Sequence, residues 1–110
     1  MSTLENFEIL KEGINRGKFM EMFERFFDEN VTMTQNGTST TGKGKNREIQ
    51  DNFIKNSTIH EIKIISSVLN GDSVSYQMSM HFEVGGHVIN KIQDVNQLWE
   101  NGLVVQEVYN

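Results

Sequence analysis

The chain has 110 residues, and its 15 acidic and 10 basic side chains give a formal net charge of −5. A chain of this length is expected to form a single domain, residues 1–110, around one hydrophobic core. The sequence contains no cysteine, which excludes a disulfide framework, a thiolate metal site and a cysteine nucleophile. An acidic chain without a clustered basic face is also a poor partner for nucleic acid.

The N-terminal residues do not combine a basic segment with an apolar run, and no segment approaches the roughly 18 apolar residues of a membrane span. We therefore expect a cytoplasmic protein with no membrane partner.

The first part of the chain has the periodicity of helices. Ser2 and Glu5 form the capping-box pattern that begins a helix, and apolar residues at helical spacing follow as far as Ile14. Gly17 is typical of the left-handed residue that ends such a helix. A second amphipathic helix is predicted from an apolar stripe of five residues: Phe19, Met22, Phe23, Phe26 and Phe27.

A short strand at 31–35 and a glycine-containing loop at 38–45 are expected next. Asn46 is then expected to cap a third helix of about ten residues, whose buried side includes Ile49 and Phe53. The basic side chains around this loop are predicted to be solvated: Lys43, Lys45 and Arg47.

The longest regular pattern is a strict alternation of apolar and polar residues over 73–84. Because successive strand side chains point to opposite faces, this alternation predicts a long, half-buried strand. Gly85-Gly86 and Asn101-Gly102 predict two-residue hairpin turns, and residues 70–72 a three-residue loop. From residue 58 onward we therefore predict a four-stranded antiparallel meander, with strands at 58–69, 73–84, 87–99 and 103–109.

Helices gathered early and strands gathered late predict an α+β fold, with three N-terminal helices packed on a curved, mainly antiparallel sheet. This order of elements, with Gly42-Lys-Gly44 leading into the third helix and Asn101-Gly-Leu-Val-Val105 near the end, resembles the SnoaL-like branch of the nuclear-transport-factor-2-like superfamily. The resemblance spans nearly the whole chain. It implies a cone with a central pocket between the helices and the concave sheet face, and a homodimer through the convex face.

Members of that superfamily include isomerases, dehydratases, epoxide hydrolases, polyketide cyclases and binding modules without catalysis, so the resemblance leaves the chemistry open. The carboxylate base and the tyrosine of ketosteroid isomerase are expected near Thr34 and near Ile9 or Leu10, where this chain lacks both groups. The same isomerisation is therefore not expected.

Hairpin parity assigns the strand side chains to the two faces of the sheet. Two-residue turns pair Tyr76 with Val95 and Met80 with Lys91, and they pair Trp99 with Val104, Gln97 with Gln106 and Val95 with Val108. These residues share one face, which we assign to the core. The three-residue loop adds Ile62, Ile64 and Val68 to that face and sets His60 opposite Phe82. We predict that the pocket is lined by Phe23, Phe27, Met33, Phe53, Tyr76, Met78, Met80, Lys91, Gln93 and Trp99.

The other sheet face carries mostly polar residues and one apolar patch, which consists of Ile92, Leu98, Val105 and Tyr109. A patch of this kind predicts a symmetric homodimer through the outer face. A solvated face with scattered apolar residues is the alternative.

Two residues are candidates for catalysis. Asp94 is outward in the predicted register, and a slip of one residue would turn it into the pocket. His60 near the pocket rim is a candidate ligand contact or general base. His60 and His81 are predicted on opposite faces, and no histidine pattern has metal-ligand spacing, so we expect no metal and no cofactor. Lys91 either extends to the rim or marks the site of an anionic or carbonyl ligand.

The sequence thus supports three functional hypotheses. The first is a binding protein for a small apolar or carbonyl-containing organic molecule. The second is a cofactor-independent acid–base enzyme of the isomerase, dehydratase or polyketide-cyclase type. The third is a protein-interaction module in which the pocket is packed core.

Overall fold

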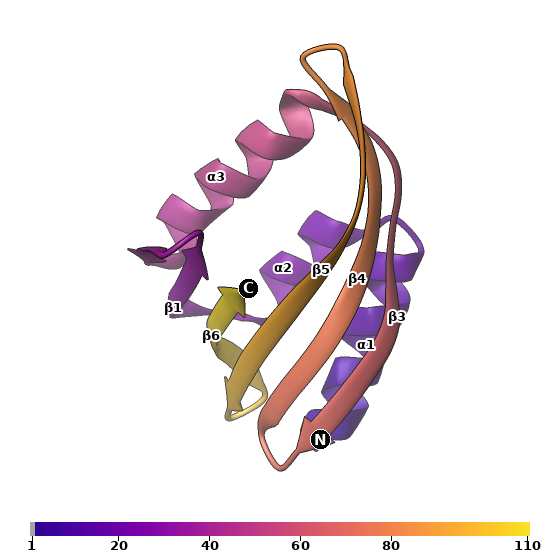
Figure 1. Ribbon diagram of the computed structural model, residues 1–110. Helices are drawn as coiled ribbons and strands as arrows, with labels where there is room; N and C mark the ends of the chain where they lie inside the picture. Colours follow the sequence, from indigo (N-terminus) through magenta and orange to yellow (C-terminus); the bar gives the residue numbers. More distant parts are fainter. Residues whose placement is uncertain (1) are drawn as a thin grey trace.

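The computed structural model describes residues 2–110 and contains three helices and six strands (Figure 1). In chain order these are α1 (Thr3–Asn15), α2 (Phe19–Phe26), β1 (Phe27–Gln35), β2 (Thr38–Thr41), α3 (Lys43–Lys55), β3 (Ser57–Asn70), β4 (Ser73–Val84), β5 (His87–Glu100) and β6 (Leu103–Tyr109). The strands form one curved sheet in the order β2-β1-β6-β5-β4-β3. All neighbouring strands are antiparallel except β1 and β6, which run parallel. The predicted α+β class and curved sheet are confirmed.

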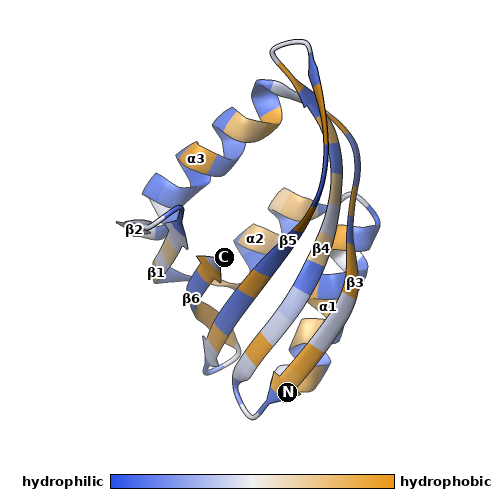
Figure 2. Ribbon diagram, in the orientation of Figure 1, coloured by the Kyte–Doolittle hydropathy of each residue, from blue (hydrophilic) through white to orange (hydrophobic). Residues whose placement is uncertain are grey.

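All three helices pack on the same face of the sheet, which we call the concave face. Phe7 of α1 lies 5.7 Å from Tyr76, Phe26 of α2 lies 5.7 Å from Trp99, and the Phe53 ring of α3 lies 5.1 Å from Phe82. Figure 2 shows hydrophilic and hydrophobic bands along β4 and β5. Because successive side chains point to opposite faces, one face of the sheet packs on the core and the other contacts solvent. Within residues 2–110, no helix has the length and apolar character needed to cross a membrane.

The capping box predicted for the first helix is present, because the Ser2 hydroxyl accepts from the Glu5 amide and the Glu5 carboxylate accepts from Ser2. Gly17 has φ +81° at the turn between α1 and α2, as expected. The next element boundaries differ from prediction. Phe27 begins β1 instead of extending the second helix, and the predicted loop at 38–45 contains strand β2.

The third helix begins before Asn46, so the predicted N-cap was wrong. The Asn46 side chain is 1% exposed, and its amide donates to the carbonyl oxygens of Val31, Thr40 and Gly42. Asn46 therefore ties the first turn of α3 to β1 and β2. Contacts with three carbonyl groups satisfy the buried Asn46 amide, which could not otherwise be buried without cost.

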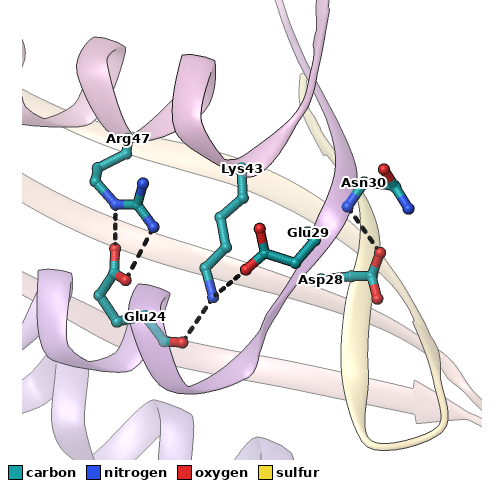
Figure 3. Close-up of polar contacts among 6 residues, drawn as sticks. All are labelled: Glu24, Asp28, Glu29, Asn30, Lys43 and Arg47. Carbon is teal, nitrogen blue, oxygen red and sulfur yellow. Dashed lines mark hydrogen bonds and ion pairs between the residues drawn. The ribbon is translucent and has the colours of Figure 1, made fainter.

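Lys45 is exposed as predicted, whereas Lys43 is buried and Arg47 is half-buried in an ion pair, and these two residues hold α3 against α2 (Figure 3). The Lys43 side chain is buried, and its Nζ donates to the Glu24 carbonyl oxygen at 2.8 Å, with a Glu29 carboxylate oxygen 4.0 Å away. Arg47 donates through two nitrogens to the Glu24 carboxylate, and this contact lowers the pKa of Glu24. These contacts fix the N-terminal half of α3, which positions its other half over the sheet.

The register of the central hairpin is as predicted, with Tyr76 opposite Val95 and Met80 opposite Lys91. The β3–β4 hairpin differs, because Asn70 pairs with Ser73 across a two-residue turn and irregularities interrupt β3 at His60 and Ile65. Ile62 and Ile64 still face the core, but Val68 points outward and is 70% exposed. Counted from the turn, the bulge at Ile65 restores the predicted facing of Ile64 and Ile62, and the bulge at His60 reverses it again.

A further bulge changes the last strand. Trp99 pairs with Val104 as predicted, but Gln97 pairs with Glu107 instead of Gln106, and Val95 with Tyr109 instead of Val108. The extra residue in β6 is Val105. Because side chains alternate between faces, one extra residue turns Glu107 and Tyr109 toward the concave face. Tyr109 therefore does not belong to the predicted outer patch.

Candidate functional site

A cavity of about 100 Å³ lies between α3 and the concave face of the sheet. Most of its lining is apolar, and five of the ten predicted lining residues take part: Phe53, Met78, Met80, Lys91 and Gln93. The remaining lining residues are Phe19, Gln35, Ile49, Gln50, Ile54, Ile59, Ile62, Phe82 and Tyr109. We call this space the α3 cavity.

The other five predicted lining residues lie elsewhere. Phe23, Phe27 and Tyr76 border a separate void of about 10 Å³, too small for more than a single water molecule. Trp99 is fully buried against Phe26. Met33 lines an adjoining hollow rather than the α3 cavity. The part of the predicted pocket beside α2 is therefore filled by aromatic side chains, and no cavity remains there for a ligand.

The adjoining hollow has a volume of about 260 Å³ and a more polar lining, which includes Thr34, Thr38 and Thr40. It shares four residues with the α3 cavity, so the two spaces meet: Gln35, Ile49, Gln50 and Tyr109. A molecule bound across this boundary would have an apolar part under α3 and a polar part beside β1 and β2.

A buried carboxyl group lies behind the α3 cavity. Glu107 is 1% exposed, and one of its oxygens accepts a hydrogen bond of 2.6 Å from Gln97 Nε2. The indole Nε1 of Trp99 donates to Gln97 Oε1 at 3.0 Å. Since an indole can only donate, this contact fixes the orientation of the Gln97 amide and directs its NH₂ group to Glu107. Tyr109, which lines the α3 cavity, is the second side chain that lowers the pKa of Glu107 and so favours its ionised form.

Burial raises the pKa of Glu107 to about 7, although the hydrogen bonds from Gln97 and Tyr109 favour the ionised form. Burial, together with the neighbouring carboxylate, also raises the pKa of Tyr76 and Tyr109 well above the usual range. A carboxyl group with a pKa near neutrality exchanges its proton readily, which general acid–base catalysis requires. This group is the strongest chemical feature of the site.

The sequence interpretation missed Glu107 because it paired Gln97 with Gln106. The apolar pairs Val104-Val105 and Val108-Tyr109 put apolar residues on both faces in either register, so the local sequence contained no signal of the bulge.

Asp94 lies on the outer, convex face of the sheet and does not line the α3 cavity. It is exposed, and its carboxylate accepts a hydrogen bond of 3.1 Å from Gln77 Nε2. The slip of one residue that would turn it inward is absent from β4 and β5. The geometry therefore does not bring Asp94 to the candidate site.

His60 also lies outside the α3 cavity. The bulge in β3 brings its ring to 4.7 Å from the ring of His81, so the prediction that these two histidines occupy opposite faces was wrong. His60 Nε2 is 3.4 Å from a carboxylate oxygen of Glu83. In the described part of the chain, no group of three or more His, Asp or Glu residues is arranged to hold a metal ion.

No protein-family model matches the chain, and no curated protein matches its sequence significantly. Its structure is nevertheless similar to that of a provisionally assigned SnoaL-like polyketide cyclase from Mesorhizobium loti, with a TM-score of 0.92, 16% identity and coverage of 100% of this chain and 99% of the other. A cystatin-like-fold protein of unknown function from Xanthomonas campestris has a TM-score of 0.85 and 15% identity over 99% and 89% of the two chains.

An epoxide hydrolase from M. tuberculosis, described as LEH-like, has a TM-score of 0.76 and 10% identity over 97% and 76% of the two chains. At such low identities the likeness concerns the fold and leaves the activity open. The resemblance predicted from the sequence is confirmed at this level: the chain has the cystatin-like α+β fold of the SnoaL-like proteins.

Proposed function

We propose that this protein binds a small, largely apolar organic molecule in the α3 cavity. The observation that carries the proposal is a concave space lined by apolar side chains such as Phe53 and Phe82, on which the polar groups of Gln93 and Tyr109 converge. Small-molecule sites typically combine such a lining with a few polar groups that orient the ligand. The structurally similar proteins whose names refer to a cyclase and an epoxide hydrolase support a small-molecule ligand.

The dimensions limit the ligand. An apolar cavity of about 150 Å³ holds benzene, and the α3 cavity has about 100 Å³ but opens into the adjoining hollow of about 260 Å³. A molecule with one ring or a short aliphatic chain, carrying a carbonyl or hydroxyl group toward Tyr109, fits this arrangement.

A thermal-shift screen of the purified protein against single-ring aromatic compounds, short fatty acids and keto acids tests this proposal. A ligand at one hundred times its Kd stabilises the fold by about 2.7 kcal/mol, which corresponds to a shift of several degrees in Tm. Ile62→Trp fills the cavity and is expected to abolish the shift. Lys63→Trp places the same group at an exposed position on the outer face of the same strand and is the matched control. A shift that survives Ile62→Trp would place the ligand elsewhere.

A second candidate function is cofactor-independent acid–base catalysis on the bound molecule. Its specific support is the contact of Glu107 with Tyr109, which links a proton-holding carboxyl group to the wall of the cavity. When Glu107 is ionised, it accepts a hydrogen bond from Tyr109. When the Tyr109 oxygen takes a proton from a ligand carbon, the phenolic proton of Tyr109 passes to Glu107, which becomes protonated, and the reverse transfer returns it. Isomerase, dehydratase or cyclase chemistry requires such proton movement.

Hydrogen–deuterium exchange at the carbon next to the carbonyl group of a bound ligand, followed by NMR, tests this candidate. Glu107→Gln is expected to reduce the exchange rate by at least about a hundredfold, the usual contribution of a general base. Asp94→Asn is the matched control and is expected to leave the rate unchanged. If ligands bind but undergo no exchange above the solvent rate, the protein is a binding protein without this activity.

The third candidate is association through the convex face, as a homodimer or with another protein. Four large apolar side chains on the outer surface of β3 and β5, the strands on either side of β4, are at least half exposed: Ile65, Val68, Val88 and Ile92. Burying these side chains against a second copy favours a symmetric dimer. Sedimentation velocity of the protein and of Ile92→Arg tests this, with a dimer expected for the first and a monomer for the second. Equal sedimentation of both would contradict it.

A further inference from the structure

We infer that the molecule bound in the α3 cavity carries a carboxylate, and that Lys91 binds this group at the cavity rim. The inference rests on the proposed binding function and adds the charge class of the ligand. It depends on the charges of the lining, on the position of Lys91 in the sheet and on the lack of a protein partner for its ammonium group.

The lining of the α3 cavity carries one positive charge and no negative charge. Among its fourteen residues, Lys91 is the charged one, and the polar groups that accompany it are three glutamine amides and the phenol of Tyr109. The chain as a whole has 15 acidic and 10 basic side chains. Since acidic side chains outnumber basic ones by three to two, an acid-free cavity with one cation differs from the average surface and favours an anion.

The position of Lys91 is set by a regular part of the sheet. It pairs with Met80 across β4 and β5, and its neighbours on the concave face are Ile89 and Gln93. The aliphatic part of the lysine can pack on these apolar groups while the ammonium stays at the rim in contact with solvent. An exposed ammonium loses little hydration when a ligand carboxylate pairs with it, so the pairing is favourable overall.

Within residues 2–110, no carboxylate lies within 4.0 Å of Lys91 Nζ, so its ammonium group is available to a ligand. Gln93 does not compete as the main anion donor, because its Nε2 is committed to the carbonyl oxygens of Asp94 and Asn110. Gln35 and Gln50 lie where the two hollows meet and offer amide donors to other polar groups of the ligand.

Matched pairs of acid and amide test the inference: benzoate and benzamide, cinnamate and cinnamamide, hexanoate and hexanamide. Each pair has nearly the same shape and differs in charge. We expect isothermal titration calorimetry to give a Kd about tenfold lower for the acid of at least one pair, which corresponds to about 1.4 kcal/mol. Lys91→Gln is expected to abolish this difference and to leave the affinity for the amide within about twofold.

Lys63→Gln is the matched control. Lys63 pairs with Ser79 on the convex face, so this variant removes the same charge from the same sheet outside the cavity. The acid preference is expected to persist in Lys63→Gln. The inference would be overturned if the unmodified protein bound acid and amide equally well. It would also be overturned if the acid preference survived Lys91→Gln. Either result would leave the proposed binding function intact. Failure of both members of every pair to bind would overturn both.

Discussion

Two amide–carboxylate pairs connect neighbouring strands on opposite faces of the same sheet. On the concave face Gln97 donates to Glu107 at 2.6 Å, and on the convex face Gln77 donates to Asp94 at 3.1 Å. Glu107 is 1% exposed and has a pKa of about 7, whereas Asp94 is exposed to solvent. The chemical groups are nearly the same, so it is burial, and not the type of residue, that raises the pKa of Glu107 toward neutrality.

The largest expected effect concerns the pH dependence of stability. The pKa of Glu107 is about 7 in the folded chain against 4.5 for an ordinary glutamate, so the folded state binds more protons between these values. The free energy of unfolding should therefore fall as pH rises from about 4.5 to about 7, by roughly 3 kcal/mol. Urea unfolding at several pH values measures this fall.

Glu107→Gln should remove most of that pH dependence, because glutamine does not titrate, and Asp94→Asn should leave it in place. If the free energy of unfolding of Glu107→Gln fell by the same amount over this pH range, another group would be the cause, and burial of Glu107 would not explain the difference between the two pairs.

The next largest effect is expected on removing the amide donor. Gln97→Met keeps the length of the side chain but leaves Glu107 without its closest donor and Trp99 Nε1 without its acceptor. We expect a loss of roughly 1–3 kcal/mol in stability, the cost of unsatisfied buried polar groups. The pKa of Glu107 should rise above its value in the unmodified chain. Gln77→Met, on the exposed face, should change stability by less than about 0.5 kcal/mol. Equal losses in the two variants would contradict this account.

The smallest effect is expected for Tyr109→Phe. This variant removes the second hydrogen bond to Glu107 and retains the aromatic ring at the cavity wall. The pKa of Glu107, followed by NMR of its side-chain carbon, should rise by less than in Gln97→Met, because Gln97 makes the larger contribution to stabilising the carboxylate. A larger rise would identify Tyr109 as the principal partner of Glu107.

The fold was predictable because its signals are local. The Ser2 and Glu5 capping box begins α1 as expected, and the unbroken alternation over 73–84 gives β4 and its pairing with β5 in the predicted register. Two-residue turns at Gly85-Gly86 and Asn101-Gly102 then fix how the strands reverse direction. Each of these features depends on residues close together in the chain.

The site was predictable only in part. Phe53, Met78 and Lys91 line the cavity as predicted, because regular strands and helices carry them. Glu107 and Tyr109 were assigned to the wrong faces, because a parity argument assumes a continuous ladder and Val105 interrupts it. Lys43 and Asn46 were misjudged because their partners lie on α2, β1 and β2, far away in sequence.

The sequence by itself therefore determined the α+β class, the order of the elements and the face of each uninterrupted strand, since periodicity and turn residues act over a few positions. Only the tertiary structure decided where the sheet bulges and which space the aromatic side chains of α2 fill. It also decided which carboxyl group is buried. A bulge depends on the competition between two registers over a whole strand pair, and burial depends on everything that packs around the strand. The pKa of Glu107 follows from both.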